Sequence, residues 1–235
     1  MSVQQFDVAI IGYGPVGATL ANLLGLCGLS AVVLEREPSV YHLPRAVSLD
    51  GEGMRLFQTL GLAEELLPRV NVSRNIRHVN AAGQLLLLIS RGGIGPEGWN
   101  HAYRFYQPEL EAVLRQGASR YPSIDVRLRC EAFALDERSD DVRIRYENLA
   151  SGKLDEVSAR YVVGCDGARS TVRRFMGAAL HDLRSHERWI VLDMILDEPP
   201  SGVPEAADEC GRVIDAIQYC DPARPTTFVP MPGQR

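Results

Sequence analysis

Three glycines near the start of the chain have the spacing needed to hold a diphosphate group. Gly12, Gly14 and Gly17 form the pattern G-x-G-x-x-G directly after the apolar run 8–11. The first glycine allows a sharp turn out of a strand, the second lets a phosphate approach the backbone, and the third lets a helix pack close to the sheet. A helix that begins here also offers unpaired N–H groups and a partial positive charge to the phosphates.

The elements that must position these glycines can be predicted from the flanking residues. The run 8–11 suits a strand buried on both faces, and the apolar residues up to Cys27 follow at helical spacing, with Gly28 expected at the helix end. A second apolar run, 31–34, leads to Glu35, an acid suited to both hydroxyls of a ribose. Together these features indicate a dinucleotide-binding unit, with NAD and FAD both left open.

Bulk composition narrows the class of protein. The 235 residues carry a net charge of −5 without basic runs, which argues against a nucleic-acid or anionic-membrane partner. No apolar run approaches a membrane span, and residues 1–7 lack the features of a signal peptide. The five scattered cysteines predict reduced thiols in a cytoplasmic protein with no metal site. Cys165 is either a catalytic thiol or a small residue under a tight turn.

The next segment combines a loop and a helix. Asp50 is expected to cap a helix that carries Met54, Phe57 and Leu60 on one face. Arg45 lies in the preceding loop, where it is either a solvated cation or a functional residue.

Several antiparallel strands interrupt this α/β pattern. A hairpin is expected over 76–90 with its turn at 81–84, followed by a helix whose first residue is Pro108. Short alternating strands at 124–128 and 142–146, with a return after Gly152, predict a β-meander.

Asp166 is the second candidate acid. It follows the expected buried strand 161–163 and precedes Gly167 and a helix capped near Ser170. At this edge of a sheet an acid can bind a ribose or, through water, phosphates, or it can simply cap a turn. Further strands are expected at 189–194, 213–219 and 226–229.

Three motifs in this order resemble the FAD-dependent aromatic hydroxylases, the class A flavoprotein monooxygenases. They are GYGPVG at 12–17 with Glu35 and Arg36, PRAVSLD at 44–50, and VVGCDGARSTVRR at 162–174. Within that family, 44–50, 188–194 and 219–235 look most similar to the 3-(3-hydroxyphenyl)propionate hydroxylases. The later Gly-Asp motif of the family, which closes the FAD site, is absent from the sequence, and the chain is therefore expected to bind FAD poorly or not at all.

The resemblance implies a fold and a set of domains. It is an α/β fold, with an FAD/NAD(P)-binding Rossmann-like domain and β-meander over 1–75 and 103–183. An inserted, mainly antiparallel β substrate domain, incomplete here, would occupy 76–102 and 184–235.

The resemblance also implies cofactor contacts. The residues expected to cradle the FAD pyrophosphate are Gly12, Gly14, Pro15, Val16 and Gly17. Glu35 would hold the adenosine ribose and Arg36 would flank the adenosine. Arg45 and Gln107 would lie near the flavin and its phosphate linker, and Asp166 near the pyrophosphate and the NAD(P)H site.

The implied activity is hydroxylation of a phenolic substrate with NAD(P)H and O₂ through a flavin C4a-hydroperoxide. The candidates for proton transfer, His101, Tyr103, Tyr106 and His186, are better explained as structural or exposed residues, so no catalytic residue is assigned. An anionic substrate would require an arginine that the sequence does not single out. Another flavin or NAD oxidoreductase and a non-catalytic nucleotide-binding module are the alternatives, and homo-oligomer formation is left open.

Overall fold

The computed structural model describes residues 3–195 and 215–233. The chain divides into two compact units, Met1–Leu43 with Glu111–Glu187 and Pro44–Leu110 with Arg188–Arg235. Among the described residues, no helix has both the length and the apolar character needed to cross a lipid bilayer.

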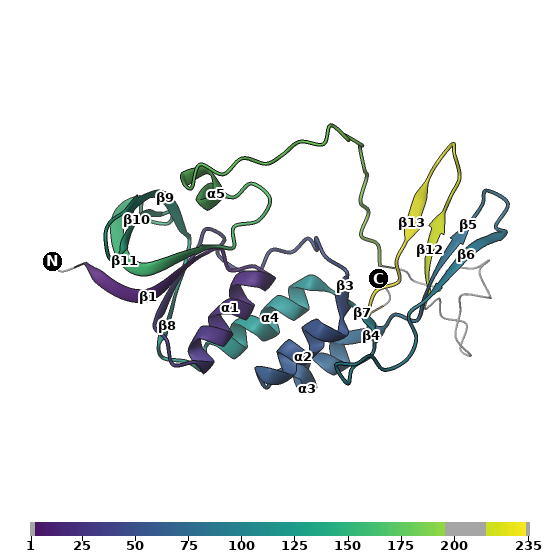
Figure 1. Ribbon diagram of the computed structural model, residues 1–235, viewed down its shortest axis with the longest axis horizontal. Coiled ribbons are helices and arrows are strands. Elements are labelled where there is room, and N and C mark those ends of the chain that lie inside the picture. Colours follow the sequence, from purple (N-terminus) through teal and green to yellow (C-terminus); the bar gives the residue numbers. More distant parts are fainter. Residues whose placement is uncertain (1–2, 196–214, 234–235) are drawn as a thin grey trace. The chain divides into compact units, whose positions relative to one another are not determined.

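The first unit is built on a six-stranded sheet in the order β8-β2-β1-β11-β10-β9 (Figure 1). Its strands are β1 (Gln4–Ile11), β2 (Ala31–Glu35), β8 (Ile124–Leu128), β9 (Cys130–Glu137), β10 (Val142–Asn148) and β11 (Lys153–Gly164). The pairs β2–β8, β1–β2 and β1–β11 are parallel, whereas β9, β10 and β11 form an antiparallel meander. The strand before the glycine loop is therefore central, as the sequence predicts.

Helices cover one face of this sheet. Helix α1 (Pro15–Leu26) contacts β1, β2 and β8, and Asn22 Nδ2 donates to the Leu114 carbonyl of α4 (Gln107–Ala118) at 2.8 Å. Gly28, with φ of +72°, ends α1 as expected, since its N–H donates to the Gly25 carbonyl and the next N–H donates to the Leu24 carbonyl. The short helix α5 (Thr171–Phe175) is capped by Ser170 Oγ, which accepts from Arg173 N.

The meander curls over the other face of the central strands. Ala9 and Ile11 of β1 pack in one buried cluster with Ile144, Tyr146 and Val157 of the meander. Both faces of β1 are therefore covered, which explains its continuous apolar run.

The second unit contains two small sheets and three short helices. Sheet β3-β7-β4 is antiparallel, and sheet β13-β12-β5-β6 includes one parallel pair, β12 with β5. Its strands are β3 (Ser48–Asp50), β4 (Val70–Val72), β5 (Asn75–Val79), β6 (Leu85–Ser90), β7 (Ala102–Phe105), β12 (Ala216–Tyr219) and β13 (Thr226–Phe228). Its helices are α2 (Gly51–Thr59), α3 (Ala63–Leu66) and η1 (Leu67–Arg69), and it also contains the first four residues of α4.

Two local predictions are confirmed in this unit. Asp50 Oδ1 accepts from Gly53 N at 2.8 Å at the start of α2, whose residues Met54 and Phe57 are buried. The expected hairpin is β5–β6, and Asn80 Oδ1 accepts from Ala82 N and Gln84 N within its turn.

The meander differs from its prediction. Strand β8 pairs with β2 at the opposite edge of the sheet, and the meander instead contains β9, which was not expected. Arg129, with φ of +56°, lies between the two strands where the chain turns. The strand expected at 161–163 is observed as the end of β11. The prediction that this strand is buried is wrong, because Tyr161 and Val163 are 62% and 37% exposed.

The strands expected near the C-terminus are only partly observed. Residues 189–194 form no strand and their side chains are largely exposed, because no partner strand lies beside them in the described part of the chain. Residues 213 and 214 lie outside the described residues, whereas β12 and β13 fall within the predicted ranges.

Candidate functional site

Two of the three glycines are required by the fold itself. Gly12 has φ of +101°, and a Cβ there would lie 2.5 Å from the Cys165 carbonyl oxygen. A Cβ on Gly17 would overlap the Gly12 carbonyl oxygen. These contacts keep the turn out of β1 tight and bring α1 close to the sheet.

Gly14 is different, because nothing in the protein crowds it. A Cβ at this position would meet no atom within 4 Å. Gly14 is the N-cap of α1, which has no side-chain cap and no acid in its first turn, with Pro15 as its first residue and Val16 69% exposed. An open backbone at an uncapped helix start fits the diphosphate of a dinucleotide.

Glu35 at the end of β2 faces the same loop. Its Oε2 accepts from Tyr13 N at 2.6 Å and its Oε1 from Glu37 N at 2.8 Å, and the residue is 9% exposed. A carboxylate has further lone pairs, so Glu35 can still accept from sugar hydroxyls. The neighbouring Arg36 is exposed and lies 3.4 Å from a Glu37 oxygen.

Asp166 reaches the loop because β11 runs parallel to β1. Cys165 N donates to the Ile11 carbonyl at 2.7 Å, which places the turn after β11 against Gly12. Asp166 Oδ2 accepts from Thr171 N at 2.6 Å, so the carboxylate caps the turn before α5. Its Oδ1 is enclosed and has no hydrogen-bond partner within residues 3–195 and 215–233. The turn-capping interpretation is therefore observed, and the second carboxylate oxygen lies enclosed within the protein.

Cys165 fits the structural alternative. Burial, reinforced by the negative charge of Asp166, raises the pKa of its thiol, which favours the unreactive protonated form. The described cysteines are free, and no group of His, Cys, Asp or Glu in the described ranges could hold a metal ion.

Arg45 and Gln107 are brought together in the second unit. Gln107 Oε1 accepts from Arg45 N at 2.7 Å and from Ala46 N at 2.8 Å, and the glutamine is 7% exposed. Gln107 thus fixes the backbone of the loop that carries Arg45, whose side chain is exposed. The first unit likewise brings together the glycine loop, Glu35 and Asp166.

The sequence analysis missed a contact between Arg115 of α4 and Tyr13 of the glycine loop. Arg115 Nη2 donates to the Tyr13 carbonyl at 2.9 Å, and its guanidinium carbon lies 4.8 Å from the centre of the Tyr13 ring. The same Nη2 lies 3.4 Å from Glu111 Oε2, one turn earlier in α4. Burial raises the pKa of Tyr13 to about 12. The i,i+4 spacing of Glu111 and Arg115 predicts their pairing, but the contact with Tyr13 depends on how α4 packs.

Comparison with known proteins agrees with this geometry. The family described as "FAD binding domain" matches residues 5–234. A probable NADH-specific resorcinol 4-hydroxylase of Rhodococcus jostii (strain RHA1) is 42% identical over 95% of this chain and 40% of its own length. A 3-(3-hydroxy-phenyl)propionate/3-hydroxycinnamic acid hydroxylase of Mycobacterium sp. (strain JLS) is 37% identical over 93% of this chain and 36% of its own length. The chain thus spans less than half the length of these curated relatives.

Solved structures show the same relationship. The flavin-dependent monooxygenase PieE, solved with FAD and substrate, matches 75% of this chain and 33% of its own with a TM-score of 0.68 and 26% identity. p-Nitrophenol 4-monooxygenase PnpA from Pseudomonas putida DLL-E4 matches 74% of this chain and 44% of its own with a TM-score of 0.68 and 25% identity. With a family match over nearly its whole length and aromatic hydroxylases among its relatives, this chain belongs to the FAD-binding domain family of flavoprotein monooxygenases.

Proposed function

We propose that this chain is the nucleotide-binding part of an FAD-dependent monooxygenase that hydroxylates a phenolic substrate with NAD(P)H and O₂. The observation that carries the proposal is the open backbone at Gly14, beside the uncapped start of α1 and the inward-facing Glu35. Family membership and the aromatic hydroxylases among its relatives support the reaction class.

The residues have separate roles in this proposal. The pyrophosphate would rest on the loop formed by Gly12, Gly14, Pro15, Val16 and Gly17. Glu35 would bind the adenosine ribose, with Arg36 flanking the adenosine. Asp166, in the turn after β11, would approach the pyrophosphate side of the cofactor. Arg45 would approach the flavin end, on a backbone held by Gln107.

The protein and the cofactor divide the chemistry between them. Bound FAD, reduced by NAD(P)H, supplies the activation of O₂ that amino-acid side chains cannot perform. The chain contributes binding, orientation and the exclusion of water from the reacting centre. We assign 1–75 with 103–183 to the FAD-binding domain and 76–102 with 184–235 to part of the substrate domain.

We further propose a cytoplasmic protein with a small aromatic substrate and O₂ as its partners. The acidic net charge without basic runs supports the absence of nucleic-acid and membrane partners, and the scattered cysteines support a reducing compartment.

The test is made on the natural full-length protein with a panel of phenols. We expect bound flavin absorbance, and phenol-stimulated NAD(P)H oxidation that consumes O₂ and yields a hydroxylated product in excess of H₂O₂. Hydride transfer without O₂ consumption would instead assign the protein to another class of oxidoreductase. A colourless protein that takes up no added FAD would mean a non-catalytic module.

A further inference from the structure

The backbone of Tyr13 is held from both sides by charged side chains. Tyr13 N donates to Glu35 Oε2 at 2.6 Å, and the Tyr13 carbonyl accepts from Arg115 Nη2 at 2.9 Å. Glu35 ends β2 and Arg115 lies in α4, so two elements that are distant in sequence fix the backbone of one loop residue. We call these three residues the Tyr13 clamp.

Arg115 is itself fixed in place. Its side chain is 14% exposed, and its Nη2 lies 3.4 Å from Oε2 of Glu111, whose side chain is 3% exposed. Its guanidinium carbon lies 4.8 Å from the centre of the Tyr13 ring. The ion pair along the helix and the stacking on the ring both restrict the guanidinium, so its donation to the Tyr13 carbonyl is preorganised.

The clamp determines the direction of the next N–H group. The peptide bond between Tyr13 and Gly14 is trans, and the C=O and N–H of a trans peptide point in opposite directions. Because the Tyr13 carbonyl points to Arg115, the Gly14 N–H points away from it. No group within residues 3–195 and 215–233 accepts a hydrogen bond from Gly14 N, and a Cβ on Gly14 would meet no atom within 4 Å. An unpaired donor therefore lies at an open position beside the start of α1.

The charge of Arg115 also strengthens this donor. A guanidinium that donates to a carbonyl polarises the whole peptide group, and the N–H of that group becomes more positive. Helix α1 has no acid in its first turn and no side-chain cap that would oppose this effect. Arg115 thus adds to the positive character of the helix start from the side opposite to the Gly14 N–H.

We propose that Arg115 is a positioning residue for the diphosphate of the bound dinucleotide. It acts through the Tyr13 peptide, by directing and polarising the Gly14 N–H that donates to a phosphate oxygen. The inference rests on the proposed FAD-dependent function, and it adds to that site a residue from α4 outside the glycine loop. Because the effect is transmitted to one phosphate donor, it should be specific to the diphosphate and absent for the adenosine part.

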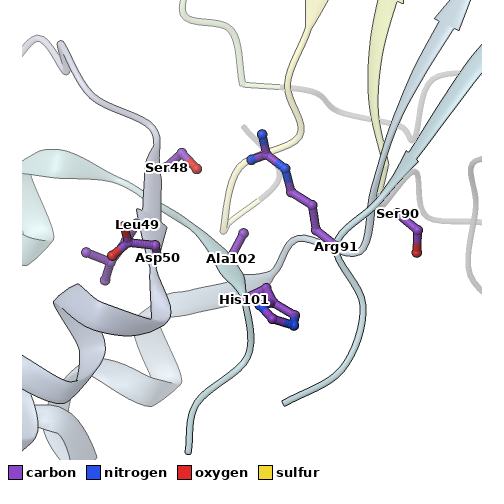
Figure 2. Close-up of a pocket in the computed structure, with 7 residues that line it drawn as sticks. All are labelled: Ser48, Leu49, Asp50, Ser90, Arg91, His101 and Ala102. Carbon is purple, nitrogen blue, oxygen red and sulfur yellow. The ribbon is translucent and has the colours of Figure 1, made fainter. Parts of the chain in front are cut away.

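The largest cavity described in the second unit contains no residue of the clamp. Figure 2 shows this cavity, about 490 Å³ in volume, bordered by β3, by residues 90–91 at the end of β6 and by residues 101–102 at the start of β7. The clamp residues and Glu111 all belong to the first unit. A substitution of Arg115 therefore changes none of the residues that line the cavity.

The test compares two ligands that differ in the diphosphate. ADP contains adenosine and the diphosphate, whereas adenosine contains only the part proposed to contact Glu35 and Arg36. Both ligands, and FAD, are titrated calorimetrically into the natural full-length protein after removal of its FAD. We expect Arg115→Met to weaken ADP binding at least about fivefold and adenosine binding less than about twofold, the scale of one hydrogen bond that depends on a charged group.

Two further variants complete the test. Arg115→Lys keeps a charged donor and should retain part of the ADP affinity. Arg138→Met, at an exposed ion pair with Asp136 beside the end of β9, should change the affinity for neither ligand. Equal losses of ADP and adenosine affinity in Arg115→Met would mean a purely structural role, and unchanged affinities would mean no role. Either result would overturn the proposal.

The failure of this inference can be distinguished from the failure of the proposed function. A wild-type protein that binds FAD, together with an Arg115→Met protein that has the same ratio of ADP to adenosine affinity, would overturn only the positioning role. A wild-type protein that takes up no FAD would overturn the proposed function and this inference with it.

Discussion

At the scale of single residues, the three loop glycines have different surroundings. Gly12 and Gly17 are excluded from carrying a side chain by the protein's own carbonyl groups, whereas Gly14 faces open space. A structural explanation therefore accounts for Gly12 and Gly17, whereas we propose that Gly14 leaves its backbone open to a diphosphate.

This difference predicts opposite outcomes for two valine variants. Gly14→Val should fold with stability within about 1 kcal/mol of the wild type, the usual scale for a change at an N-cap, yet bind FAD at least about tenfold more weakly. Thermal unfolding and FAD titration measure the two effects separately.

Gly17→Val is the matched control. The Gly17→Val protein should be less stable than the wild type, because the valine side chain would overlap the Gly12 carbonyl. A Gly14→Val protein that retained full FAD affinity would show that the loop does not contact the diphosphate.

Tyr13 predicts an alkaline loss of stability. Its pKa is raised to about 12 in the folded state by burial, against about 10 when unfolded. The folded state therefore holds the phenol proton more tightly, and the stabilisation is complete below pH 10 and lost as the pH rises from 10 to 12. By pH 11 the loss is about 1.4 kcal/mol.

Tyr13→Phe keeps the ring and removes the titration. Denaturant unfolding at pH 8 and pH 11 should show the wild type losing stability relative to this variant. An unchanged difference between the two proteins would mean that the phenol is not buried as described.

At the scale of elements, α4 acts as a support for the glycine loop. Arg115 joins the Tyr13 carbonyl and ring to the helix, and Glu111 is 2% exposed beside it. The loop that we propose to bind the diphosphate is thus supported by Arg115, which is not among the residues proposed to contact the cofactor. Arg115 is a positioning residue in this interpretation.

Arg115→Met should destabilise the protein by about 2 kcal/mol, since it removes the charged donor to the Tyr13 carbonyl and weakens the charge balance beside Glu111. The double variant Arg115→Met/Glu111→Gln should recover part of that loss while FAD affinity stays low, because the contact with Tyr13 is still missing. Unfolding and FAD titration of both variants test this. Recovery of FAD affinity in the double variant would contradict a positioning role.

At the scale of the whole molecule, the second unit exposes an apolar edge strand. Leu85 to Ile89 of β6 are 37% to 59% exposed, and β6 pairs only with β5 in the described sheet. An unpaired apolar edge can recruit another strand and promote association.

Leu86→Lys is expected to reduce self-association of the chain and its binding of a hydrophobic dye. Leu86 is 59% exposed, so the melting temperature should change little. Sedimentation at several concentrations provides the measurement. A monomeric wild-type chain with no dye binding would show that the strand edge is not adhesive.

Local features of this fold could be predicted from sequence because their causes lie within a few residues. The glycine loop between β1 and α1, the Asp50 and Ser170 caps and the β5–β6 hairpin each follow from side chains acting on their own backbone. Glu35 was also predictable, since the spacing of one strand–helix–strand unit sets its place.

Only the tertiary structure decided the contacts between distant segments. The pairing of β11 with β1 brings Asp166 to the glycine loop. The pairing of β8 with β2 places β8 outside the meander, and the packing of α4 brings Arg115 to Tyr13. Arg104 shows the same limit, because a sequence can reveal a cation but cannot reveal that the fold leaves it only 5% exposed. Capping and periodicity act over one or two turns, whereas strand order and the partners of a buried charge depend on which surfaces meet when the whole chain folds.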